Sequence, residues 1–403
     1  MKKLKNKVAV VGISEAIGSR RRDDATFFQL AYEASRQAVT DAGVTKDDIK
    51  YCFFSTANEL FNRQPLMGIY IAEALGWSQK PLYEYTNAGG ASGGAISTAY
   101  NYCASGEADL VLCVGGDKIS DADAPGLNGF QNLIIYGNDC IWEVPFGSGG
   151  MGHFANMCQA YMSKYGITAE QAAKVSVKNH GNALLNPHAQ SPKRITVEDV
   201  LNSKELAYPI KFLDCSLVSD IFVALVFASE EKAKELTDDP IWVKGIGHAN
   251  DVGKLGWREV MNPGFTFGQT PVTWVAAKEA YEQAGITDPL NQLDVAQIQD
   301  GFTWVELITS EMLGFCEIGG AGRLIDSGET QMGGKLPINP SGGCIGHGHA
   351  YGGAGQMELA ETVRQLRGQA GGYQVTPIPN TGLAQTMGGS GMCMSTVVVL
   401  GRD

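Results

Sequence analysis

The segment most suited to chemistry lies between residues 333 and 355, where glycine is dense and two histidines stand two positions apart. It reads G-G-K-L-P-I-N-P-S-G-G-C-I-G-H-G-H-A-Y-G-G-A-G, with the histidines at His347 and His349. An imidazole can donate or accept a hydrogen bond, act as a base or bind a metal. Glycines let backbone N–H groups approach a ligand closely. A packed core needs neither feature, so the segment predicts an active-site loop.

The same loop contains a Cys344-x-x-His347-x-His349 pattern, which raises the alternative of a metal site. Thiolate and imidazole both bind zinc, but a structural zinc site needs four ligands. The sequence offers no evident fourth ligand. We therefore predict no metal here and keep the histidines for acid–base or hydrogen-bonding roles.

The composition describes a large protein with an ample core and few charges. The chain has 403 residues, 44% of them apolar and 18% charged, and 31 basic against 43 acidic residues give a net charge of −12. An acidic chain argues against nucleic acid as a partner. No apolar run reaches the roughly 18 residues of a membrane span, and no signal-type segment follows Met1. We predict a cytoplasmic protein that does not contact a membrane, with its nine cysteines reduced.

Strand and helix patterns recur in the same order in two parts of the chain, which indicates an internal repeat. The string Ala42-Gly43-Val44-Thr45 returns as Ala284-Gly285-Ile286-Thr287, and Asn87 before one glycine turn matches Asn339 before another. The paired patterns are strands at 8–13 and 241–246, helices at 27–43 and 272–285, strands at 51–55 and 295–298, glycine turns at 87–94 and 339–355, and strand-like tails at 110–114 and 396–400.

The repeat predicts an α/β protein of two similar halves, residues 1–240 and 241–403. Packing the halves together should bring the two glycine turns near one another. Residues 121–209 fit neither half, because they read as irregular and helical. We expect this segment to be an insertion that covers the site.

Several strings, taken in order, resemble the thiolase superfamily, particularly its sterol-carrier-protein-x type branch, over essentially the whole chain. The resemblance implies a thiolase fold with duplicated βαβαβαββ halves and an inserted loop domain. It also implies a homodimer that acts on acyl thioesters, with coenzyme A as part of the substrate and no other cofactor. The strings are Lys178-Asn179-His180 with Asn186-Pro187, Asp214-Cys215-Ser216 with Ser219-Asp220, Gln299-Asp300-Gly301-Phe302, and Asn339-Pro340-Ser341-Gly342-Gly343 with Gly348-His349.

The chain departs from that family where the nucleophile belongs. The family carries a catalytic cysteine in a string like N-x-x-C-A-S-G, and here the segment Asn87 to Gly93 puts Gly90 at that position. Cys103 imitates the motif more literally, but it lies at the end of the following helix. We predict that the nucleophile is absent and that Cys103 is not catalytic.

Of the other thiolase groups, one histidine clearly survives. His349 keeps the place of the family's catalytic histidine, while Gln299 stands where the family has an Asn or His. The region of the late acid–base cysteine reads Thr386-Met387-Gly388-Gly389, and Cys393 falls some residues too late for that role.

Without a nucleophile, ordinary thiolase chemistry is disfavoured, since removing one typically costs on the order of a millionfold in kcat. The remaining groups can still stabilise a thioester enolate. They are His349, a group or water held by Gln299, and backbone N–H donors at Gly90, Gly388 and Gly389. Such an enolate forms when a β-hydroxyacyl-CoA breaks between its α and β carbons. This retro-aldol step needs a base for the hydroxyl and an oxyanion site.

The candidate bases are His347 and Tyr351, which flank His349, although plain packing is an equal alternative for Tyr351. Trp304 is expected to shape the pocket. Relatives without the cysteine, which this chain resembles, are retro-aldolases that commonly work with a small zinc-ribbon/OB-fold accessory subunit. The resemblance therefore implies such a partner.

Two other functions stay open at this point. The first is a retro-Claisen acyltransferase working with a partner subunit, by direct attack of coenzyme A or with a cysteine from elsewhere, such as Cys344. The second is a non-catalytic assembly subunit, which the retention of His349 disfavours.

Overall fold

The computed structural model describes residues 7–57, 59–62, 64–123, 129, 133–146, 149–389 and 391–402. Its main sheet is built from β1 (Val8–Ile13), β2 (Tyr51–Thr56), β3 (Leu82–Thr86), β4 (Leu110–Lys118), β7 (Asp220–Ser229), β8 (Ile241–Asn250), β9 (Val295–Ile298), β10 (Thr381–Gly388) and β11 (Met394–Gly401). Their order in the sheet is β3-β2-β4-β7-β1-β8-β11-β10-β9. β2 runs parallel to β3 and β4, and β9 runs parallel to β10. The other neighbours are antiparallel.

The strand order is repeated outward from the centre of the sheet, where β1 pairs with β8. Outward from β1 come β7, β4, β2 and β3, and outward from β8 come β11, β10 and β9. The place of β3 is taken in the second half by an isolated parallel bridge between Ala296 and Ile338. The predicted α/β fold of two similar halves is confirmed.

One detail of the predicted repeat is wrong. The sequence pairs the tail at 110–114 with the tail at 396–400, but the strand order equates β4 with β10 and β7 with β11. β10 was not predicted because Gln385 and Thr386 interrupt its apolar run. Both side chains are nevertheless buried, and Gln385 donates to Ser395 Oγ at 3.1 Å.

Helix boundaries follow local capping signals. The helices are α1 (Phe27–Asp41), α2 (Met67–Ala74), α3 (Ala91–Ser105), α5 (Gly150–Tyr165), α6 (Ala169–Ala183), α7 (Val197–Asn202), α8 (Glu230–Leu236), α9 (Arg258–Met261), α10 (Pro271–Ala284), α11 (Pro289–Gln292), α12 (Thr303–Met312), α13 (Ala321–Ser327), α14 (Gly343–Gly346) and α15 (Ala354–Leu366). α1 follows a capping box between Thr26 and Gln29. α10 begins at Pro271 and ends before Gly285, whose φ is +73°.

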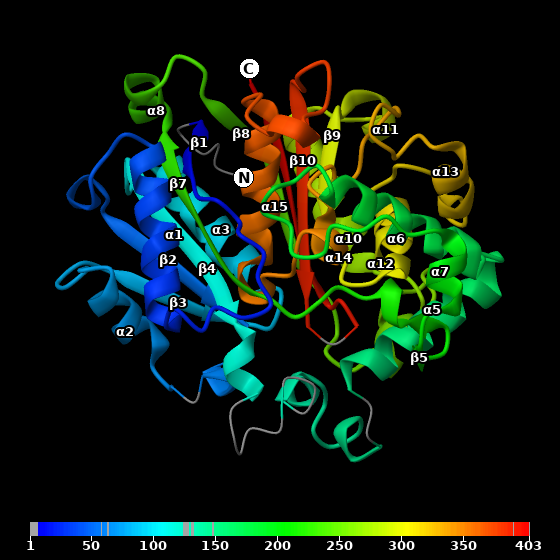
Figure 1. Ribbon diagram of the computed structural model, residues 1–403. Coiled ribbons are helices and arrows are strands. Elements are labelled where there is room, and N and C mark those ends of the chain that lie inside the picture. Colours follow the sequence, from blue (N-terminus) through cyan, green and yellow to red (C-terminus); the bar gives the residue numbers. More distant parts are fainter. Residues whose placement is uncertain are drawn as a thin grey trace.

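Helices α3 and α15 lie between the two halves of the sheet, while α1 and α10 cover the outer faces (Figure 1). One apolar core joins Ile96 of α3 and Met357 of α15 with strand residues of both halves. The beginnings of α3 and α15 therefore meet, and the backbone N–H of Gly355 donates to Ser92 Oγ at 3.0 Å. The two glycine turns lie side by side, as predicted.

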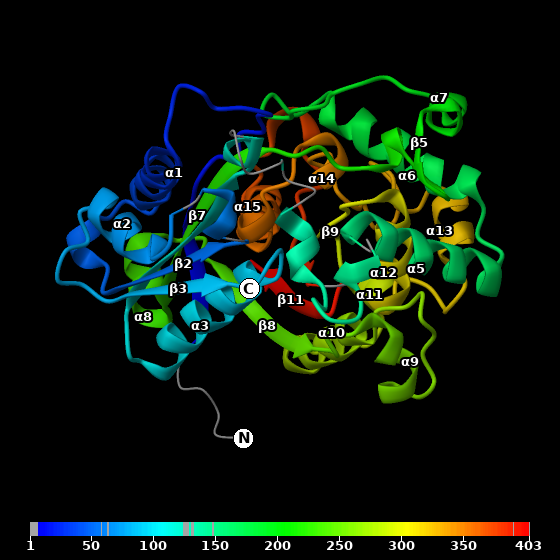
Figure 2. The same cartoon turned by 90° about the horizontal axis from the view of Figure 1, so that it is seen from below.

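A long insertion joins β4 to β7, where the second half has a short loop between β10 and β11. It contains α5, α6, α7 and the small antiparallel pair β5 (Glu205–Ala207) and β6 (Ile210–Lys211). Helix α6 packs on α12 and α13, and Figure 2 shows these helices grouped at one side of the sheet. Part of the predicted insertion, at 124–128, 130–132 and 147–148, lies outside the described residues.

Candidate active site

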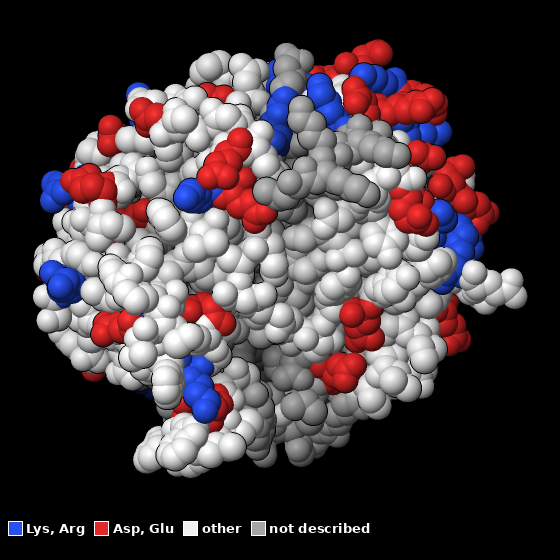
Figure 3. Space-filling model, turned by 180° about the vertical axis from the view of Figure 1, so that it is seen from behind, with Lys and Arg blue, Asp and Glu red and all other residues white. Residues whose placement is uncertain are grey.

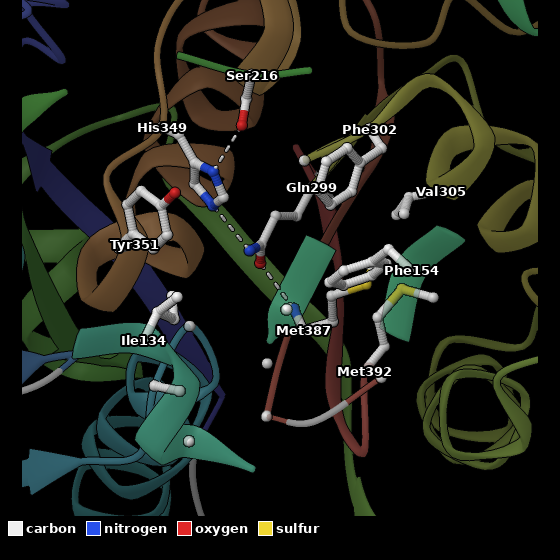
Figure 4. Close-up of a pocket in the computed structure, with 18 of the residues that line it drawn as sticks. Ile134, Phe154, Ser216, Gln299, Phe302, Val305, His349, Tyr351, Met387 and Met392 are labelled. Carbon is white, nitrogen blue, oxygen red and sulfur yellow. Dashed lines mark hydrogen bonds between the residues drawn. The ribbon is translucent and has the colours of Figure 1, made fainter. Parts of the chain in front are cut away.

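A cavity of about 150 Å³ lies between the insertion, the carboxyl end of β9 and the loop that carries His349 (Figure 4). His349, Tyr351, Gln299, Gly388 and Gly389 all line it. Five of the seven residues predicted for the site thus meet in one place, although they come from three separate segments of the chain.

The other two predicted residues do not line this cavity. His347 is fully buried, and its Nε2 contacts the carbonyl oxygen of Ala16 at 2.5 Å. Gly90 is the residue before α3, and a Cβ atom placed on it would meet the side chain of Met394 at 3.0 Å. Met394 lines an adjoining cavity instead. A side chain at the position expected for a nucleophile would therefore point toward the adjoining cavity.

Buried polar side chains from the family-like strings hold the loop in place. Asp300 accepts hydrogen bonds from the backbone N–H of Cys344 at 2.5 Å and from Asn179 Nδ2 at 2.6 Å. Lys178 forms a buried ion pair with Glu306 at 3.0 Å. Burial, and then the nearby Glu306, raise the pKa of Asp300. These members of the strings support the loop from beneath, while other members, among them Gln299 and His349, line the cavity itself.

Gln299 and His349 form a hydrogen-bonded pair whose proton positions follow from its surroundings. Gln299 Oε1 accepts from Thr386 Oγ1 and from the backbone N–H of Met387, both at 2.8 Å. The amide nitrogen therefore faces His349 Nε2, 3.1 Å away, and as a donor it requires Nε2 to carry no proton. The proton of His349 then lies on Nδ1 and is donated to Ser216 Oγ at 3.0 Å.

His349 is neutral at ordinary pH because burial lowers its pKa to about 4. Its Nε2 lone pair is occupied by Gln299, so it offers no N–H to the cavity through that atom. A primary amide carries two N–H groups, and the second N–H of Gln299 is not used by His349. Because Gln299 lines the cavity, the hydrogen-bond donor available to a ligand at this point is the glutamine rather than the histidine.

We expect acid to weaken the fold through His349. Its folded pKa of about 4 lies below the usual value of about 6.5, so between these values the unfolded chain binds a proton that the folded chain does not. The free energy of unfolding should fall by about 3 kcal/mol from this group as the pH drops from 7 to 4. Urea unfolding at several pH values tests this. His349→Gln should lose this part of the pH dependence, and equal slopes in both proteins would contradict the assignment.

Tyr351 lies face to face with His349, with ring centroids 4.0 Å apart and an interplanar angle of 13°. Its φ of +45° falls in the left-handed region that non-glycine residues rarely adopt. Asp117 holds this turn, since it accepts from the backbone N–H of Gly352 at 2.8 Å and from Thr56 Oγ1 at 2.6 Å. Burial raises the pKa of Tyr351, so the phenol is protonated at neutral pH.

Among the described residues, no cysteine lines the cavity that contains His349. Cys344 is buried 3.7 Å from Glu358 Oε1, and burial raises its pKa well above the usual value. Cys103 lies in the apolar core at the end of α3, where burial also raises its pKa. Cys393 lines the adjoining cavity of about 540 Å³, together with Tyr351 and Gly389.

Sequence reasoning missed the residues that orient Gln299 and His349, and it assigned no role to the apolar side chains that line the cavity. Ser216 orients His349 and was visible as part of the Asp214-Cys215-Ser216 string, but that string gave it no role. Thr386 orients Gln299 from β10 and carried no signal of its own. Trp304 was expected to shape the pocket, yet it packs in the core behind it, while its neighbours Phe302 and Val305 line the cavity.

Metal-ligating clusters and membrane-spanning helices are both missing from the described part of the chain. It contains no group of three or more His, Cys, Asp or Glu side chains placed to hold a metal ion. Nor does it contain a helix long and apolar enough to cross a bilayer. The basic run at Arg20 to Arg22 is partly neutralised, because Arg21 pairs with Asp23 at 3.0 Å and Arg22 with Asp24 at 2.8 Å.

Comparison with known proteins agrees with this architecture. The thiolase N-terminal domain model matches residues 8–202, and the thiolase C-terminal domain-like model matches residues 265–402. The chain is 34% identical to an acetyl-CoA acetyltransferase from Methanothermobacter thermautotrophicus, over 95% of this chain and 97% of that protein. It is 29% identical to a steroid side-chain-cleaving aldolase from Thermomonospora curvata, over 90% of each.

The solved structure described as "Ltp2-ChsH2(DUF35) aldolase" is also similar, with a TM-score of 0.84 and 26% identity over 100% of this chain and 99% of that one. Relatives named acyltransferase and aldolase both perform carbon–carbon chemistry, which makes this protein an enzyme of the same kind. The chain belongs to the thiolase superfamily, in the branch that includes sterol carrier protein 2.

Proposed function

We propose that this enzyme cleaves a β-hydroxyacyl-CoA by a retro-aldol reaction. The observation that carries the proposal is a cavity with an ordered His349–Gln299 pair and no cysteine among its described lining residues. Acyl transfer through a covalent intermediate needs a nucleophile beside that pair. Retro-aldol cleavage needs an oxyanion donor and a proton acceptor, and the cavity offers groups of both kinds. Coenzyme A takes part as the thioester portion of the substrate.

In the proposed reaction, the second N–H of Gln299 binds the thioester oxygen and stabilises the enolate as the α–β bond breaks. Gly388 and Gly389, whose backbone lines the same cavity, are candidates for further donors. His349 acts as a positioning residue, because its Nε2 fixes the direction of the Gln299 amide. The oxyanion role expected for His349 thus passes to its partner.

Tyr351 is the group proposed to handle the proton of the β-hydroxyl. Its raised pKa makes a permanent phenolate unfavourable, so we propose a relay through the neutral phenol. The phenol oxygen accepts the β-hydroxyl proton while its own proton passes to the α carbon. The O–H and Cα–Cβ bonds break, a C=O and a Cα–H bond form, and the products are an aldehyde or ketone and a shortened acyl-CoA.

A second candidate is a retro-Claisen acyltransferase. It is favoured by the acetyl-CoA acetyltransferase relative and by the thiol of Cys393, which lines the adjoining cavity. Cys344 is a poorer candidate for the nucleophile, because burial disfavours its thiolate. A purely non-catalytic assembly role is disfavoured by the ordered pair in the cavity.

Product analysis and mass spectrometry of the intact protein separate the two reactions. With a β-hydroxyacyl-CoA we expect equal amounts of carbonyl product and shortened acyl-CoA, no consumption of free coenzyme A, and no mass added to the protein. Cys393→Ser should keep this activity. An acyl adduct on Cys393 or Cys344 that forms and decays as fast as turnover would overturn the retro-aldol proposal and establish the acyltransferase.

We also propose a homodimer core that binds a small accessory subunit of the zinc-ribbon/OB-fold kind. The similar aldolase structure carries a second component in its name, ChsH2(DUF35), beside Ltp2. Exposed apolar side chains support a partner here, and the face drawn in Figure 3 has a largely uncharged middle. The segments that carry these side chains are joined by a hydrogen bond from Leu255 N to Glu143 Oε1 at 3.0 Å. The exposed side chains are Ile141, Trp142, Phe146, Trp257, Val260 and Met261.

A further inference from the structure

The cavity around His349 has two chemically different walls. Ser216, Gln299 and His349 supply polar atoms on one side. Figure 4 shows the side chains of Phe154, Phe302, Val305 and Met392 gathered on the other side, away from Tyr351. The polar wall is where the proposed bond cleavage takes place, so the apolar wall faces the part of the substrate beyond it.

The apolar wall is built from aromatic rings and flexible sulfur-containing side chains. The rings of Phe154 and Phe302 lie 4.7 Å apart between centroids, at 46° to one another. Met151, Met387 and Met392 also line the cavity. Tilted aromatic pairs and thioether sulfurs both make favourable contacts with a flat ring, and methionine adapts its shape to fill the space around one.

Neither this cavity nor the adjoining one is lined by Lys or Arg among the described residues. The charged residue described in their lining is acidic, Asp251. The buried cation nearby, Arg258, is already occupied by Asp251 at 3.0 Å and by the carbonyl oxygens of Gln269 and Gly391. A carboxylate on the substrate would therefore be buried without a partner, which is strongly disfavoured.

We propose that the substrate carries a neutral aromatic or alicyclic ring on its β-carbon. The second product is then a neutral aldehyde or ketone bearing that ring, and not an oxo acid. The identity of the product rests on the proposed retro-aldol function, whereas the binding preference depends on the two walls alone.

Saturated thioesters test the binding preference separately from catalysis, because without a β-hydroxyl they cannot undergo retro-aldol cleavage. Calorimetric titration of the native protein, with any co-purifying subunit left in place, should compare 3-phenylpropionyl-CoA, hexanoyl-CoA and glutaryl-CoA. We expect the ring thioester to bind at least about tenfold more tightly than the linear one, and about a hundredfold more tightly than the dicarboxylate. If hexanoyl-CoA binds as tightly as 3-phenylpropionyl-CoA, the substrate does not require a ring. If glutaryl-CoA binds as tightly as 3-phenylpropionyl-CoA, the substrate does not have to be neutral.

A matched pair of substitutions on α5 links the preference to this wall. Met151→Lys places a cation in the cavity and should reverse the order, improving glutaryl-CoA binding by about tenfold or more. Met162→Lys lies on the same helix outside the cavity lining and should leave the order unchanged. Failure of Met151→Lys to favour glutaryl-CoA, in a protein that still binds hexanoyl-CoA, would contradict the placement of the acyl group. A different outcome is that the three saturated thioesters bind with the expected order of affinities while 3-hydroxy-3-phenylpropionyl-CoA is not cleaved. In that case the retro-aldol proposal fails and the substrate preference stands.

Discussion

Replacing Tyr351 with phenylalanine is expected to lower kcat for retro-aldol cleavage by about a thousandfold, the middle of the range for loss of a general acid–base group. Phenylalanine keeps the ring that stacks on His349 and the apolar contacts, and it removes the phenol oxygen proposed to accept the β-hydroxyl proton. Binding of the saturated ring thioester should change little. The loss should therefore fall on kcat rather than on substrate affinity.

Tyr281→Phe is the matched control for this variant. Its hydroxyl is also buried and donates to the carbonyl oxygen of Leu313 at 2.8 Å, but it does not line the cavity. It should lower stability slightly and leave kcat as in the unmodified enzyme. If both variants retain full kcat, Tyr351 serves packing alone, which was the alternative that the sequence left open.

The strands were predictable from the sequence where all residues of a short, continuous run are buried. Strand β1 has six consecutive buried residues, and the buried residues of β9 coincide with the predicted run. The strand missed, β10, places buried polar side chains in the sheet, where Gln385 binds Ser395 of β11 and Thr386 binds Gln299, which follows β9. Such pairing across the sheet leaves no periodic signal in one strand.

The residue types of the candidate site were predictable from the sequence, but the directions in which their side chains point were not. His347 and His349 stand two apart, yet one side chain is locked in the interior and the other lines the cavity, because the glycine between them adopts φ +139°. In irregular backbone, spacing alone does not tell which face a side chain takes. The proton position on His349 depends on Thr386 and Ser216, which lie far away in the chain, so no local pattern could reveal it.

Replacing Gln299 with glutamate tests that proton arrangement, because it changes hydrogen-bonding type with almost no change in shape. One carboxylate oxygen can still accept from Thr386 and Met387, as the amide oxygen does. The other oxygen faces His349 Nε2 and can only accept, so the histidine must carry a proton there. The pKa of His349 should rise from about 4 through the new opposite charge, which NMR titration of the imidazole measures.

The same change removes the N–H proposed for the thioester oxygen and puts negative charge where the enolate forms. We expect kcat to fall by about a hundredfold to a thousandfold, as for loss of an oxyanion donor. Gln297→Glu is the matched control. That residue is buried on β9, accepts from Ser341 Oγ at 3.1 Å and does not line the cavity, so kcat and the His349 titration should stay unchanged. A pKa of His349 that stays at about 4 in Gln299→Glu, together with an unchanged kcat, would contradict both the coupling of the pair and the proposed oxyanion role of Gln299.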